Sequence, residues 1–125
     1  MTPNWDLPQN YKLTFEIYHQ NQGQGTAWYL IFNDPNDSKR CVVGYIQDAT
    51  KYQVWAWNGS SEQKYTSQYS SQTGVWHEEE LTVENGTLKF HDITITPPNV
   101  DLNTLTNITI YRTSSKYRNI KVKPL

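Results

Sequence analysis

Two tryptophans and a glutamine occupy alternate positions in residues 52–58, YQVWAWN. Because side chains two apart on a β-strand point to the same side, Gln53, Trp55 and Trp57 share one face of this predicted strand. An indole ring can stack on the apolar C–H face of a sugar ring, and a side-chain amide can bind the sugar hydroxyls. The spacing therefore predicts a saccharide-stacking surface on this face.

Other aromatic residues lie on neighbouring predicted strands and can extend this surface. The candidates are Tyr18, Trp28, Tyr45 and Tyr111. The alternative is that Trp55 and Trp57 belong to a sandwich core, since large aromatics dominate cores. Tyr52, Val54 and Ala56 already supply an apolar inner face, which favours the surface interpretation. The predicted ligand-binding residues are Gln53, Trp55, Trp57, Tyr45 and Tyr111.

Strands with a period of two must hold these residues in place. Apolar residues alternate in residues 12–19 and 81–95, and Asn85-Gly86 within the second stretch suits a type I′ hairpin turn. The continuous apolar run at residues 27–32 fits a strand covered on both faces, or one whose second face is an aromatic binding surface. Further strands are predicted at residues 41–47, 52–58, 63–70, 107–112 and 118–123. Between them, the loop at residues 97–107 is expected to turn Val100, Leu102 and Leu105 inward.

About ten short strands separated by turns, with no confident helix, predict an all-β fold. The expected architecture is a two-sheet antiparallel β-sandwich, or jelly roll. Its 125 residues suit a single domain over residues 1–125, in which residues 1–10 form an irregular lead-in.

The arrangement resembles a concanavalin A-like, or laminin G-like, jelly-roll domain. The likeness rests on Val75-Trp76-His77 opening a strand, on the ELTVENGTLKF hairpin, and on a last strand YRNIKV at residues 117–122. The resemblance implies that the last strand returns beside the first, and that the domain is a lectin, a carbohydrate-binding module, an interaction domain or, in some families, a glycoside hydrolase. The Asn-, Gln- and Tyr-rich composition is also similar to that of modules from phage tail and virion proteins and from microbial surface adhesins.

The acidic run at residues 77–80, HEEE, is the densest group of titratable side chains. Glu78 and Glu80 share a strand face, and a retaining glycosidase needs two carboxyl groups roughly 5 Å apart. The E-x-D-x-x-E signature of jelly-roll glucanases is absent, however. A solvated acidic edge that discourages strand pairing between molecules explains the run better.

Metal binding has one weak candidate, the loop NDPND with Asp34, Asn36 and Asp37. Its oxygen atoms suit a structural Ca²⁺ ion, as in several lectins of the resembled superfamily, but the same residues make an ordinary turn. The three histidines lack the spacing of a transition-metal site. We therefore predict no cofactor, with calcium as the alternative.

Charge and cysteine content exclude several classes of function. The 11 basic and 12 acidic residues give a net charge of −1 without a basic run, which argues against nucleic-acid or anionic-membrane binding. Cys41 is the only cysteine, so no intramolecular disulfide can form. The first residues do not resemble a signal peptide, and no apolar stretch is long enough to span a membrane.

These observations predict a non-catalytic glycan-binding module, in which Trp55 and Trp57 are the stacking platforms. Its expected setting is a phage receptor-binding or tail protein or a surface adhesin, on a virion or an extracellular surface. The expected partner is a glycan or cell-surface polysaccharide. One alternative is a structural module of a virion or adhesin that assembles with other subunits. A glycoside hydrolase that uses Glu78 and Glu80 is the weaker alternative.

Overall fold

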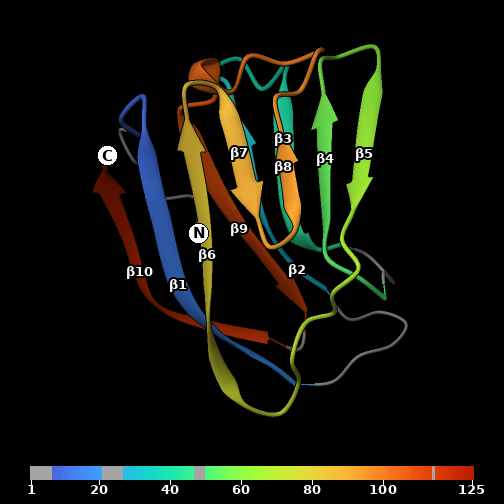
Figure 1. The fold of residues 1–125 in the computed structure, drawn as a ribbon, viewed down its shortest axis with the longest axis vertical. Helices are drawn as coiled ribbons and strands as arrows, with labels where there is room; N and C mark the ends of the chain where they lie inside the picture. Colours follow the sequence, from blue (N-terminus) through green and yellow to red (C-terminus); the bar gives the residue numbers. More distant parts are fainter. Residues whose placement is uncertain (1–6, 21–26, 47–49, 114) are drawn as a thin grey trace.

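The computed structural model describes residues 7–20, 27–46, 50–113 and 115–125. These ranges contain ten β-strands and one short 3₁₀ helix (Figure 1). The strands are β1 (Tyr11–His19), β2 (Ala27–Asn33), β3 (Arg40–Tyr45), β4 (Gln53–Trp57), β5 (Glu62–Thr66), β6 (Trp76–Glu84), β7 (Thr87–Phe90), β8 (Ile93–Ile95), β9 (Asn107–Thr113) and β10 (Ser115–Pro124), and the helix is η1 (Leu102–Thr104). Of the predicted lead-in, residues 1–6 lie outside the described ranges.

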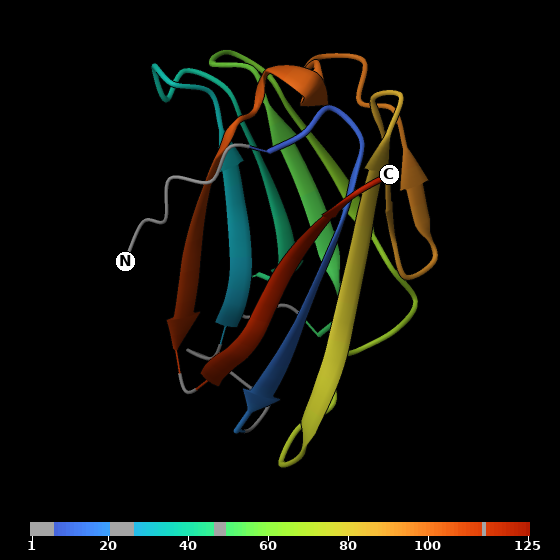
Figure 2. The same ribbon diagram turned by 90° about the vertical axis from the view of Figure 1, so that its left-hand side faces the viewer.

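The strands form two five-stranded sheets, and every pairing within them is antiparallel. The first sheet has the order β10-β1-β6-β7-β8, and the second has the order β5-β4-β3-β2-β9. Figures 1 and 2 show the two sheets as separate layers. The predicted two-sheet β-sandwich of about ten strands is confirmed.

Alternating side chains from the two sheets fill the space between them. In β1, the inward residues Tyr11, Leu13, Phe15 and Ile17 are at most 4% exposed, whereas the residues between them are half-buried. In β4, Val54 and Ala56 are fully buried, as their spacing predicted. Burial of each large apolar side chain contributes roughly 1.5–3 kcal/mol relative to exposure, so this shared core is what holds the sheets together.

The hairpin between β6 and β7 has the predicted turn. Asn85 and Gly86 have φ angles of 54° and 78°, and two positive φ angles are the requirement of a type I′ turn. The predicted return of the last strand is also confirmed, because β10 pairs antiparallel with β1 along its length.

The loop that leads to β9 is anchored as expected. Val100, Leu102 and Leu105 are all at most 5% exposed. The sequence did not predict η1 within this loop; Asp101 caps it by accepting a hydrogen bond of 3.0 Å from the backbone N–H of Asn103.

The fifth strand ends earlier than predicted, at Thr66 instead of residue 70. Directly after it, the Ser67 hydroxyl and the Gln68 backbone N–H both donate hydrogen bonds to the carboxylate of Asp92. These bonds turn the chain away from β4, so the ladder stops there. In the described part of the chain, no helix is long and apolar enough to cross a membrane.

Candidate functional site

The outer face of the second sheet carries three rows of side chains that run across its strands. Registers between neighbouring strands place Tyr111, Tyr29, Gly44, Gln53 and Thr66 in one row, Thr109, Ile31, Val42, Trp55 and Lys64 in the next, and Asn107, Asn33, Arg40, Trp57 and Glu62 in the third. The tryptophans of β4 thus lie beside apolar residues of β3 and β2 and beside charged residues of β3 and β5.

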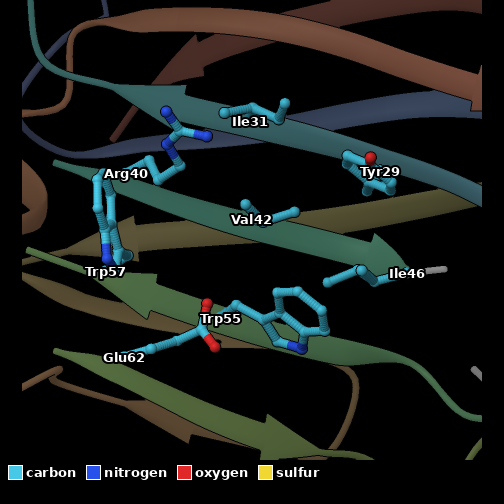
Figure 3. A pocket seen from close by; sticks show the side chains of 8 residues that line it. All are labelled: Tyr29, Ile31, Arg40, Val42, Ile46, Trp55, Trp57 and Glu62. Carbon is cyan, nitrogen blue, oxygen red and sulfur yellow. The ribbon is translucent and has the colours of Figure 1, made fainter. Parts of the chain in front are cut away.

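A hollow of about 310 Å³ opens on this face (Figure 3). Its lining residues are Tyr29, Ile31, Arg40, Val42, Ile46, Trp55, Trp57 and Glu62. Figure 3 shows Val42 at the centre, with the other side chains arranged around it. Gly44 lies in the same strand as Val42 and pairs with Tyr29 and Gln53. Because Gly44 has no side chain, no atom rises from the sheet surface between those two residues. The hollow therefore has an apolar floor and two tryptophan walls.

Polar neighbours hold both tryptophan rings in place. The Trp55 indole N–H donates a hydrogen bond of 3.1 Å to the Gln53 side chain, and the Lys64 ammonium lies 4.3 Å from the Trp55 ring centre. The Arg40 guanidinium lies 5.1 Å from the Trp57 ring centre. Cations over indole faces are attracted by the ring quadrupole, so both rings are oriented before any ligand arrives.

Charges at the rim of the hollow are balanced. Arg40 lies 3.4 Å from the carboxylate of Asp37, and Lys64 lies 3.5 Å from that of Glu62. Among the described residues, the Arg40 Nε atom is buried and has no hydrogen-bond partner, whereas the side chain as a whole is 38% exposed, so the outer guanidinium N–H groups are the donors that face the hollow. The rim therefore offers one planar donor group and one carboxylate acceptor.

A pair of stacked tyrosines borders the hollow on the β9 side. The rings of Tyr29 and Tyr111 lie 4.5 Å apart with an angle of 18° between their planes. Tyr29 lines the hollow, whereas Tyr111, 43% exposed, packs behind it. Tyr111 therefore supports the position of Tyr29.

The structure places four of the five predicted ligand-binding residues on this face, namely Gln53, Trp55, Trp57 and Tyr111. Tyr45 does not lie there: it is 1% exposed, and its ring packs against His19 inside the sandwich. The reason is the strand period, because Cys41, Val43 and Tyr45 have the same parity and all point inward.

Two further aromatic candidates also lie elsewhere. Trp28 is fully buried, and its indole N–H donates a hydrogen bond of 3.0 Å to the Ser71 hydroxyl. Tyr18 lies on the outer face of the first sheet, where its ring centre is 5.8 Å from that of Trp76. Among the aromatic residues that the structure describes, the β4 tryptophans and the tyrosines Tyr29 and Tyr111 belong to the candidate site.

The sequence interpretation missed the hollow's floor and its charged rim. Arg40 lay one residue outside the predicted third strand, although its even number gives it the parity of Val42. Ile31 lies in the run at residues 27–32, for which the sequence allowed a strand covered on both faces or one with an aromatic binding surface; its side chain lines the hollow. Glu62 precedes the start predicted for the fifth strand, so its pairing with Trp57 could not be inferred.

The carboxylates of the glycosidase alternative lie on the opposite side of the molecule. Glu78 and Glu80 are exposed on the outer face of the first sheet, and Glu80 makes a 2.6 Å ion pair with Lys12. A hollow of about 450 Å³ lies beside them, and its described lining, which includes no tryptophan or tyrosine, is Glu78, Glu79, Glu80, Thr82, Lys89 and His91. These carboxylates are therefore separate from the aromatic face.

The edge-protection interpretation of the acidic run is correct only in part. Strand β6 is the middle strand of the first sheet, but its pairing with β7 begins at Leu81. Within the described ranges, the part of β6 before Leu81 pairs with β1 alone. Glu78 and Glu80 protrude from this part, whereas Glu79 does not belong to the solvated set, because it points inward and is 2% exposed.

Glu79 is the centre of a buried polar cluster that the sequence did not predict. Its carboxylate accepts hydrogen bonds from His77 Nε2 at 2.8 Å, from His91 Nε2 at 2.7 Å and from the Tyr52 hydroxyl at 2.5 Å. The Tyr52 and His91 rings also stack, with centres 4.0 Å apart. A sequence signal existed, since Glu79 has the parity of the inward residues Leu81 and Val83.

Burial and hydrogen bonding oppose each other in this cluster. Burial alone raises the pKa of Glu79, but the bonds from His77, His91 and Tyr52 outweigh it, so the pKa lies below its ordinary value. Burial alone lowers the pKa of His77, but the hydrogen bond and charge of Glu79 raise it overall. The cluster therefore favours a carboxylate beside a protonated His77.

The residues of the calcium alternative stabilise their own loop. The Asp34 carboxylate accepts hydrogen bonds from the Ser38 hydroxyl, the Ser38 N–H and the Lys39 N–H at 2.6, 2.7 and 3.1 Å. Asp37, whose φ angle is 53°, accepts one of 3.0 Å from the Asn33 amide. This pattern is that of the ordinary turn, and in the described ranges no group of three or more His, Cys, Asp or Glu side chains could hold a metal ion.

The two sheets and their order form a jelly-roll β-sandwich, and this fold is similar to that of solved galectin structures. The structure of sheep galectin-11 in complex with glycerol aligns with a TM-score of 0.66 and 10% identity, covering 98% of this chain and 96% of that one. The crystal structure of an ancestral congerin aligns with a TM-score of 0.61 and 14% identity, again over 98% and 96% of the two chains. At these identities, the likeness shows the fold alone. No protein-family model matches this chain, and no curated protein sequence does.

Proposed function

We propose that this protein is a non-catalytic glycan-binding module whose binding site is the hollow between Trp55, Trp57 and Tyr29. The observation that carries the proposal is the outward, half-buried pair of tryptophans beside a hollow of about 310 Å³. Saccharide rings need an aromatic platform for their C–H faces and planar polar groups for their hydroxyls. Both lie around this hollow.

Pre-orientation of the rings supports the proposal further. Gln53, Lys64 and Arg40 fix the two indoles in the unliganded protein, so little side-chain entropy is lost when a ligand binds. The galectin-like fold adds support of a weaker kind, since fold alone does not determine function.

The experiment is a saccharide titration followed by tryptophan fluorescence and calorimetry, after a glycan array has identified a binder. Trp57→Ala is expected to abolish binding, because it removes one wall of the hollow. Unchanged affinity in this variant would refute the assignment of the site. A glycan array without any binder would refute the function.

Trp76→Ala is the matched control. Trp76 is 37% exposed on the outer face of the first sheet, and the Arg118 guanidinium lies 3.8 Å from its ring centre, as Arg40 lies over Trp57. Its removal also deletes an exposed indole under a cation, yet it leaves the hollow intact. Saccharide affinity should therefore not change.

A structural assembly module is the second candidate function. The exposed Tyr111 favours it, because it lies on β9 at the edge of the second sheet, where another chain can dock. Size-exclusion chromatography with light scattering separates the two functions. A stable oligomer that Tyr111→Glu dissociates, without any saccharide binding, would favour assembly.

The setting in a phage tail protein, a virion or a surface adhesin remains a prediction, supported by the composition rich in Asn, Gln and Tyr. Fluorescently labelled protein should then bind whole microbial cells, and the free saccharide from the glycan array should displace it. Trp57→Ala should remove the cell binding as well.

A further inference from the structure

The floor of the hollow is unsuited to sugar hydroxyls. Val42 forms its centre and is 9% exposed, and Ile31 and Ile46 lie beside it (Figure 3). A hydroxyl pressed onto these side chains would lose its water partners without any replacement, which costs free energy. The group that enters deepest must therefore be apolar, such as a methyl group.

The rim requires polar chemistry close to that apolar group. Arg40 and Glu62 flank Trp57 on the neighbouring strands β3 and β5, at the same row of the sheet. The guanidinium can donate to a carbonyl oxygen, and the carboxylate can accept from an N–H or a hydroxyl group. An acetamido group combines a methyl group, a carbonyl and an N–H within three bonds.

Balanced charge argues against an acidic sugar. Arg40 is offset by Asp37, and Glu62 is paired with Lys64. A carboxylate ligand would meet two cations that are already paired with two carboxylates, so it gains no net attraction from the rim, whereas a neutral amide needs none.

From these steps, and resting on the glycan-binding function proposed above, we propose that the hollow is selective for an N-acetylhexosamine. The acetamido methyl group lies on Val42 and Ile31, its carbonyl accepts from Arg40, and the sugar ring stacks between Trp55 and Trp57. A 6-deoxyhexose supplies a methyl group but no carbonyl for Arg40. An unsubstituted hexose supplies neither.

The experiment compares the methyl β-glycosides of N-acetylglucosamine, N-acetylgalactosamine, glucose, galactose, fucose and glucuronic acid. Affinities come from calorimetry, and saturation-transfer NMR identifies the ligand protons in contact with the protein. We expect at least one N-acetylhexosaminide to bind about tenfold or more tightly than the glycoside of its parent hexose, because a methyl contact and a hydrogen bond are gained together. The strongest saturation should fall on the acetamido methyl protons.

Two variants test the contacts separately. Val42→Thr has nearly the same shape but puts a hydroxyl on the floor, so it should reduce the N-acetyl preference to about threefold or less. Arg40→Lys retains the charge but loses the planar donor. It should reduce the affinity for the acetamido sugar more than the affinity for the parent hexose. Arg118→Lys is the matched control, because Arg118 lies on the first sheet and also over a tryptophan ring. This substitution should leave the affinities for both sugars unchanged.

The outcomes separate this inference from the proposed function. Equal affinity for the acetamido and parent sugars, with binding still lost in Trp57→Ala, overturns the inference and leaves glycan binding in place. Tighter binding of fucose or of the glucuronide also overturns it. A lack of binding by every saccharide overturns both. If Val42→Thr does not fold, three other results still test the inference. These are the sugar selectivity of the wild type, the ligand protons that NMR places in contact with the protein, and the affinities of Arg40→Lys.

Discussion

The Tyr52 hydroxyl donates a hydrogen bond of 2.5 Å to the Glu79 carboxylate and thereby connects the two sheets through the core. Tyr52 directly precedes β4, the strand that carries the tryptophan pair, and Glu79 lies in the middle of β6. Because Tyr52 also stacks on His91, the contact between the sheets is both polar and aromatic. The candidate binding strand is therefore anchored from behind by a buried carboxylate.

Glu79→Gln is expected to destabilise the fold by about 3 to 5 kcal/mol, as is typical when one partner of a buried charged group is lost. The amide group would place its N–H donors against donors of His77, His91 or Tyr52. Urea unfolding at neutral pH measures the change. Glu78→Gln is the control, since this exposed neighbour should change stability by only about 0.5 kcal/mol. Equal effects of the two variants would contradict the role of the cluster.

The same cluster predicts a stability optimum in mildly acidic solution. Glu79 has a lowered pKa, so its contribution is complete above the ordinary value of 4.5 and is lost as the pH falls through the lowered value. His77 has a raised pKa, so its contribution is complete below the ordinary value of 6.5 and is lost as the pH rises through the raised value. The contribution is therefore greatest between about pH 4.5 and 6.5.

The measurement is the difference in unfolding free energy between wild type and Glu79→Gln across the pH range. Subtracting the two unfolding free energies cancels the contribution of titratable groups that both proteins share and that do not interact with Glu79. The difference should have its maximum within this window and decline on both sides. A difference that does not vary with pH would show that the carboxylate does not interact with His77 as the geometry indicates.

Strand periodicity predicted the positions that depend on short-range alternation. Val54 and Ala56 point inward and Trp55 and Trp57 outward, because a strand with one apolar face has a single favourable orientation. The same rule, applied strictly, also places Tyr45 in the core beside Val43. Aromatic type alone does not place a residue on the surface, and at Tyr45 the strand parity predicts its burial.

The buried cluster and the floor of the hollow depend on contacts between distant residues. Glu79 is tolerated inside because Tyr52, 27 residues away, and His91, 12 residues away, supply donors to it. The floor requires Ile31 and Val42 to face each other across β2 and β3. Such registers follow from the assembled sheets, so a single strand pattern does not reveal them.

Gly44→Ala tests whether the register between β2 and β3 tolerates a side chain at position 44. Gly44 has a φ angle of 148°, and a Cβ atom there would lie 2.5 Å from the Trp28 carbonyl oxygen and 2.8 Å from the Tyr29 Cα atom. Both neighbours are backbone atoms of β2, so relief requires β2 and β3 to separate. We expect a loss of about 3 kcal/mol or more in thermal or urea unfolding.

Gly74→Ala is the matched control for this substitution. Gly74 also has a positive φ angle, 75°, but a Cβ atom there would meet nothing within 4 Å. Its cost should be limited to the backbone strain of about 1 to 2 kcal/mol. If both variants lose the same stability, close packing at Gly44 makes no contribution.

Tyr111→Ala is expected to weaken saccharide binding about two- to tenfold, because Tyr111 acts through Tyr29. The stacked pair, with ring centres 4.5 Å apart, contributes about 0.5 to 1.5 kcal/mol, and its loss frees the Tyr29 ring at the border of the hollow. Tyr111→Phe retains the stack and should retain full affinity in the same calorimetric titration. If the phenylalanine variant loses as much affinity as the alanine variant, the Tyr111 hydroxyl itself binds the ligand, as the sequence first suggested, and the supporting role is wrong.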